Sequence, residues 1–215
     1  MRKKLSILIL TLIALTACTT LSSEDYFSDE PLDDSWSTES FASYLKLFQE
    51  KPLSRHDLKE GDEVYRFLVL QAGEPNHIIK VENPNNGSAR VTIKYTKSGY
   101  KLNTGRELED RKIINPSTQE FDAFVNALAQ TKFWQQENAP QYEFSNTVTT
   151  GPPLFLIEAV KQGKTVRLDG IESRFGKNMP DLALAFYDLA QLERDWTLET
   201  YFSSWKEVDW EYPDE

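Results

Sequence analysis

The sequence has few of the residues on which metal and disulfide sites are built. Its 215 residues include one cysteine and two histidines. One cysteine excludes a disulfide within the chain, and a histidine-based zinc site would need both His56 and His77, together with carboxylates, from distant loops. We therefore expect no metal and no cofactor, and we expect both histidines at the surface.

Catalytic signatures are also absent: the chain has no G-x-S-x-G, H-E-x-x-H or C-x-x-C pattern. Gly163-Lys164-Thr165 matches the end of a phosphate-binding loop, but Glu158 occupies the position where such a loop needs its first glycine. The three residues are therefore predicted to belong to a hairpin turn.

Bases are outnumbered by acids, 24 to 34, and the acids gather at the two ends. Seven acids and no bases lie between Thr19 and Glu39, and six acids against Lys206 lie from Glu199 to the end. The body between them is nearly neutral. This acidity argues against a nucleic-acid partner, and a calcium-binding loop pattern is missing from the N-terminal run.

No hydrophobic run is long enough to span a membrane. The longest, Leu5 to Ala17, covers 13 residues and follows Arg2, Lys3 and Lys4. A spanning helix needs roughly 20 residues, so this pattern is typical of an export signal. Removing the three bases with the signal changes the formal net charge from −10 to −13.

Leu15-Thr16-Ala17-Cys18 resembles the lipobox of bacterial lipoproteins. An ordinary export signal would have a small residue where bulky Leu15 stands. The resemblance implies that residues 1–17 are removed and that Cys18 carries a diacylglyceryl group and an acylated amine, which together anchor a protein firmly. Thr19 follows the cysteine where an inner-membrane retention signal would have aspartate, so the resemblance implies the outer membrane of a bacterial cell envelope.

The rest of the chain divides into three parts. Residues 18–37 are predicted to form a solvated acidic tether, because like charges repel and keep it extended. Residues 38–195 have the composition of a single α+β domain, and residues 196–215 form an aromatic and acidic C-terminal segment. In that segment we expect a binding surface at Trp205, Trp210 and Tyr212, with rings packed back on the domain as the alternative.

Periodicity predicts an antiparallel sheet of about six or seven strands with helices packed on one face. Helices are predicted at 38–49, from Ser117 to about Thr131, where Ser117 and Glu120 form a capping box, and from Pro180 onward. Strands are predicted at 63–71, 77–82, 89–96, 100–102, 106–114, 154–160 and 164–168.

Register can be predicted for the hairpin that contains Asn85-Asn86-Gly87. Because side chains alternate with a period of two, only a three-residue loop pairs Val81 with Val91 and keeps the apolar face intact. That register also places Glu82 opposite Arg90 on the wet face. Gly87 is then expected to supply the left-handed residue of the turn.

Glu158 interrupts an otherwise apolar strand. One interpretation is an outward or edge-facing side chain paired with Lys164 or Arg167 across the hairpin. The alternative is a general acid with a raised pKa, working with Asp169 or Glu172 in a glycan hydrolase.

The body resembles a group of uncharacterised bacterial envelope proteins. The resemblance rests on Tyr65-Arg66-Phe67, Phe133-Trp134, the strand Leu156-Ile157-Glu158-Ala159-Val160 and the turn at Gly163, and covers about Glu63 to Leu192. The chain departs from the group at Gly151-Pro152-Pro153-Leu154-Phe155, where the group has an Asp-Gly step with tryptophan. The group has no established activity, so the resemblance supports a fold and transfers no function.

These features together favour a lipid-anchored, non-catalytic module that binds another envelope protein, as an assembly factor, inhibitor or immunity protein. The alternative is the glycan hydrolase described above.

Overall fold

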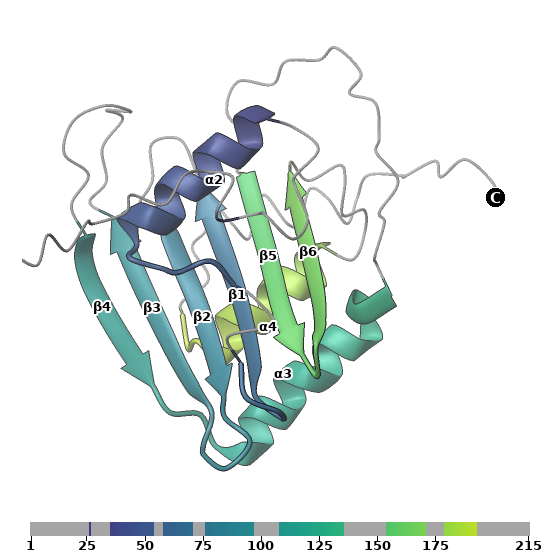
Figure 1. The fold of residues 1–215 in the computed structure, drawn as a ribbon. Coiled ribbons are helices and arrows are strands. Elements are labelled where there is room, and N and C mark those ends of the chain that lie inside the picture. Colours follow the sequence, from purple (N-terminus) through teal and green to yellow (C-terminus); the bar gives the residue numbers. More distant parts are fainter. Residues whose placement is uncertain are drawn as a thin grey trace, which may run out of the picture.

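The computed structural model describes residue 26 and residues 35–53, 58–70, 76–96, 108–135, 154–170 and 179–192. Three α-helices and six strands lie in these ranges (Figure 1). In chain order they are α2 (Ser35–Leu47), β1 (Glu63–Leu70), β2 (His77–Asn83), β3 (Arg90–Thr96), β4 (Leu108–Ile114), α3 (Thr118–Gln130), the short 3-10 helix η2 (Phe133–Gln135), β5 (Leu154–Lys161), β6 (Lys164–Gly170) and α4 (Met179–Leu189).

The strands form one antiparallel sheet in the order β4-β3-β2-β1-β5-β6. The predicted α+β class and sheet are confirmed, and β5 pairs on both sides, as its nearly continuous apolar run indicated. The turn into β6 has positive φ at both Gln162 and Gly163, the conformation that a two-residue hairpin needs. The strand expected at 100–102 lies outside the described residues.

Helices cover both faces of the sheet, whereas the sequence pattern predicted one. As predicted, α3 and α4 pack on a single face, where Tyr65 and Phe67 of β1 meet Phe124 and Phe186. The other face, called here the α2 face, packs Leu68 and its neighbours against α2 (Figure 1). The strands therefore have apolar side chains on both faces where α2 lies.

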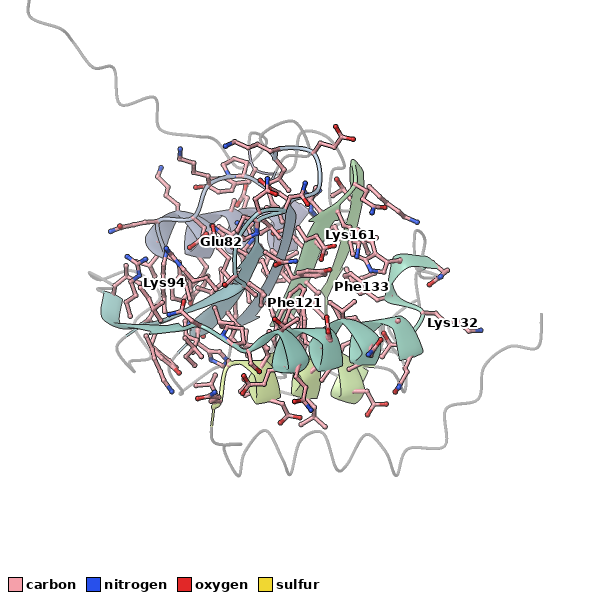
Figure 2. All side chains as sticks on the ribbon, turned by 90° about the horizontal axis from the view of Figure 1, so that it is seen from below. Glu82, Lys94, Phe121, Lys132, Phe133 and Lys161 are labelled. Carbon is pink, nitrogen blue, oxygen red and sulfur yellow. The ribbon has the colours of Figure 1, made fainter. Side chains whose placement is uncertain are left out.

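Figure 2 shows this arrangement from below. Phe121 and Phe133 lie between α3 and the sheet, Lys132 points away from the domain, and Glu82 and Lys94 lie on the side of α2.

The predicted register of the β2–β3 hairpin is confirmed: Val81 pairs with Val91, Ile79 with Ile93 and Glu82 with Arg90. The predicted role of Gly87 is wrong, because Gly87 is not among the residues with positive φ. Its N–H donates to Pro84 O at 3.0 Å, which closes a four-residue β-turn from Pro84 to Gly87. A Cβ at Gly87 would lie 2.6 Å from Pro84 Cγ, so the close approach of the proline ring is what requires glycine.

The capping box of α3 is confirmed. Ser117 accepts from the N–H of Glu120, and the Glu120 carboxylate accepts from the N–H of Ser117 at 2.7 Å. The backbone hydrogen bond from Ser117 contributes most to lowering the pKa of Glu120 below its usual value. The helix end near Thr131 was also predicted correctly.

Two expectations change at the N-terminal side and in the sheet. Tyr26, within the expected tether, is buried against α2, and its hydroxyl donates to Glu50 O at 2.9 Å. The helix α2 begins at Ser35 rather than Thr38.

His77 was expected at the surface but is buried, and its ring hydrogen-bonds the Tyr187 hydroxyl. His56 lies outside the described residues. No helix in the described ranges is long and apolar enough to cross a membrane.

Candidate functional site

One row of polar and charged side chains crosses the α2 face of the sheet. The register places Thr92, Lys80, Arg66, Glu158 and Arg167 directly opposite one another on five consecutive strands, from β3 to β6. Opposite positions in an antiparallel sheet lie about 4.5–5.5 Å apart at Cβ, so neighbours in the row interact. The apolar cluster under α2 occupies only one end of the face, and the row lies beside it.

Glu158 is held between two guanidinium groups. Arg66 donates to Glu158 Oε2 from Nε at 2.8 Å and also from Nη2, and Arg167 donates to Oε1 from Nε at 2.9 Å. The Glu158 and Arg66 side chains are each 1% exposed. Both carboxylate oxygens are therefore occupied by charged donors in a site without solvent.

Burial raises the pKa of Glu158, but the charges of Arg66 and Arg167 and their hydrogen bonds lower it by more. The net direction is downward, so Glu158 is ionised at neutral pH. A general acid must hold a proton at working pH, and this environment does the opposite. The geometry therefore does not allow Glu158 the acid role that the hydrolase interpretation required.

The other interpretation of Glu158 is half correct. The pairing with Arg167 across the hairpin is confirmed, but the side chain is buried and not outward. Of its two suggested carboxylate partners, Asp169 is paired through its backbone with Leu156, and Glu172 lies outside the described residues.

Glu50 forms a second carboxylate centre next to the row. The end of α2 places it: the N–H of Glu50 donates to Leu45 O, the N–H of Gln49 donates to Lys46 O, and Gln49 has φ 55°. This is a Schellman ending, which turns the chain sharply at its left-handed residue. The turn directs Glu50 onto the sheet, where Lys94 and Lys80 pair with its carboxylate, Lys80 at 3.5 Å.

A half-open cleft of about 420 Å³ lies between this loop and the sheet. More cationic than anionic side chains line this cleft. Glu50 and Glu82 are the acidic ones among the described residues. The cationic residues that line it are Lys51, Arg66, Lys80, Arg90, Lys94 and Arg111. The cleft, called here the cationic cleft, thus gathers positive charge on a chain whose formal net charge is −10.

Thr92 lies at the centre of the cationic part of this cleft. Lys80 is opposite it on β2, Arg90 and Lys94 are two positions away on its own strand and face, and Arg111 is diagonal to it on β4. Thr92 is 3% exposed, and its hydroxyl has no hydrogen-bond partner among the described residues. A buried hydroxyl without a partner is costly, so this one requires an explanation.

Other sites predicted from the sequence lie outside the described residues: Cys18, and Trp205, Trp210 and Tyr212 of the C-terminal segment. In the described ranges, no group of three or more metal-ligating side chains converges. The cationic cleft itself was not predicted, because the polar side of each strand was interpreted as wet. The available signal was Arg66, a charged residue within the apolar run of β1.

Comparison with known proteins identifies no relative: no family model matches the chain, and no curated protein matches it. The resemblance of the body to uncharacterised envelope proteins therefore stays a prediction.

Proposed function

We propose that this chain is a lipid-anchored, non-catalytic binding protein of the bacterial cell envelope, and that its cationic cleft binds another envelope protein. Cys18 anchors it in the outer membrane, and the acidic residues after Cys18 separate the domain from the lipid surface. The observation that carries the proposal is the cleft itself, where cations outnumber carboxylates on an otherwise acidic chain.

The charge distribution supports binding in preference to chemistry. The carboxylates next to the cleft are engaged by cations: Glu158 by two arginines, Glu50 by two lysines and Glu82 by Lys80 at 2.9 Å. Such groups are poor proton donors, whereas an excess of cations attracts and orients an acidic partner.

Photo-crosslinking in the organism's own cells tests this proposal. The intact lipoprotein would bear a photoreactive amino acid in place of Lys51, which lines the cleft and is exposed, or in place of Asn126, which is exposed on α3. We expect an adduct with one identified envelope protein from position 51, linked through an acidic segment, and none from position 126.

The charge-reversal variant Arg90→Glu should abolish the adduct at position 51, because it halves the excess of cations over carboxylates among the described lining residues, from four to two. Equal capture from both positions, or capture that survives Arg90→Glu, would refute binding at the cleft.

A further inference from the structure

The hydroxyl of Thr92 is the one buried side-chain polar atom in the described residues that lacks a hydrogen-bond partner. Its surroundings are largely cationic. Its direct partner on β4 is Ile113, and four cationic side chains surround it: Lys80 opposite on β2, Arg90 and Lys94 two positions away on β3, and Arg111 diagonal on β4. All four line the same cleft as Thr92, so the hydroxyl and the cations converge on one space.

Two carboxylates among the described residues, Glu50 and Glu82, line the cleft beside these cations. Glu50 contacts Lys80 and Lys94, and Glu82 contacts Lys80 at 2.9 Å and Arg90 at 3.9 Å. Ammonium, guanidinium and hydroxyl groups all donate hydrogen bonds, and these four cationic side chains and the Thr92 hydroxyl line one cleft. This is a set of donors for an oxyanion.

Arg66 adds further donor capacity at the same cleft. Its five N–H groups include three that donate, two to Glu158 and one from Nη1 to Lys51 O at 2.9 Å. The others have no acceptor among the described residues.

The chemistry of the face favours a carboxylate as the oxyanion. The same sheet surface already holds two carboxylates between pairs of cations, Glu158 between Arg66 and Arg167, and Glu50 between Lys80 and Lys94. The remaining lining of the cleft includes Pro52, Leu53, Leu58 and Val64. An apolar wall beside a group of cations suits a peptide segment in which acidic residues adjoin apolar ones.

We infer that Thr92, Lys80, Arg90, Lys94 and Arg111 form an oxyanion subsite that takes a carboxylate side chain of the bound protein, with the Thr92 hydroxyl as a donor. This inference rests on the proposed function and specifies what the cleft recognises. Thr92 is the specificity-determining member, because its hydroxyl has no partner among the described residues, whereas Lys80, Arg90 and Lys94 are paired with Glu50 or Glu82.

The test uses the intact lipoprotein in neutral detergent, with a fluorescein-labelled hexaglutamate peptide as probe and fluorescence anisotropy as readout. We expect Thr92→Val to weaken binding of this peptide about 10–100-fold, the usual effect of losing a hydrogen bond to a charged group. The same variant should leave the unfolding midpoint unchanged or raise it, because valine removes a buried hydroxyl that has no partner.

Thr96→Val is the matched control, since Thr96 is a buried threonine on the same strand whose hydroxyl does have partners. It accepts from the N–H of Asn76 at 3.1 Å and donates to Asn76 O at 3.4 Å. Thr96→Val should therefore lower the unfolding midpoint and leave hexaglutamate binding unchanged. The opposite changes in stability and binding separate a ligand role from a structural one.

Three results would overturn the inference. The first is hexaglutamate binding that is absent in the native chain or unaffected by Thr92→Val. The second is displacement of the peptide by inorganic phosphate at lower concentration than by free glutamate, which would make the subsite a phosphate site. The third is competition by free glutamate as effective as that by hexaglutamate, which would make the ligand a small carboxylate. Each leaves the crosslinking test of a protein partner intact, so the two proposals can fail separately.

Discussion

At the scale of single residues, the clearest feature is a carboxylate that the fold removes from water and surrounds with guanidinium groups. Glu158, Arg66 and Arg167 are buried together, and each is tolerated only because the others are present. Burying a charge is costly unless it is paired and hydrogen-bonded. Removal of one member should therefore cost far more than an exposed ion pair contributes.

Glu158→Gln is expected to lower the free energy of unfolding by about 3–5 kcal/mol, because it leaves Arg66 without its buried counter-charge. Urea denaturation followed by circular dichroism at pH 7 would measure this change. Glu82→Gln, at a pair whose side chains are 34% and 24% exposed, is the control and should cost less than about 1 kcal/mol.

The lowered pKa of Glu158 predicts how stability depends on pH. A depressed carboxyl pKa contributes stability above the ordinary value of 4.5, and this contribution is lost as the pH falls through the lowered value. The native chain should thus lose stability below pH 4.5 more steeply than Glu158→Gln. Parallel urea midpoints for the two chains between pH 5 and pH 2 would contradict this prediction.

At the scale of elements, the described helices share an unusual ending. The residues that follow α2, α3 and α4 in left-handed conformation are Gln49, Lys132 and Gln191, with φ of 55°, 55° and 49°. Glycine is the usual residue at such positions, because a Cβ makes this conformation costly by about 1–2 kcal/mol. At Gln49 the ending has a consequence for the site, since it directs Glu50 to the lysines of the sheet.

Lys132→Gly is expected to raise the free energy of unfolding by up to about 1 kcal/mol, because glycine relieves the left-handed backbone. Lys132 is exposed and points away from the domain (Figure 2), so little else changes. Ala123→Gly, at an exposed position within the same helix, should lower the free energy of unfolding by about 1 kcal/mol. Thermal unfolding of the two variants would measure the contrast, and a loss of stability in both would refute the backbone explanation.

At the scale of the whole molecule, the sheet separates two different layers. One face packs a mostly apolar core on α3 and α4, whereas the α2 face is apolar under α2 and charged beside it. The excess of cations lies on that charged part, while the acids of the chain gather toward its two ends. These cations are the charges that the proposed acidic partner would meet.

Cys18→Ser tests the proposed anchor in the full chain. Serine cannot be alkylated at sulfur, so we expect loss of fatty-acid labelling and a shift of the protein from the membrane to the soluble fraction. Ser22→Ala, a nearby substitution that leaves the cysteine in place, should keep both the label and the membrane association. Retention of Cys18→Ser in washed membranes would contradict the lipid anchor.

Local chemistry determined much of this fold in advance. The capping box of Ser117, the turn at Gly163 and the register of Val81 with Val91 each depend on residues close in sequence, or on the period-two alternation of a strand. These features could therefore be predicted from the sequence.

The cationic cleft depends instead on which polar side chains become covered. The sequence shows that Arg66, Thr92 and Glu158 alternate with apolar neighbours, and it predicts their face from the register. The sequence does not show that the segment around Glu50 would cover Arg66 and Thr92, nor that α2 would pack on the face opposite α3 and α4. Burial is set by segments distant in the chain, so the tertiary structure alone decided that a strand's polar side would become a buried, charged site.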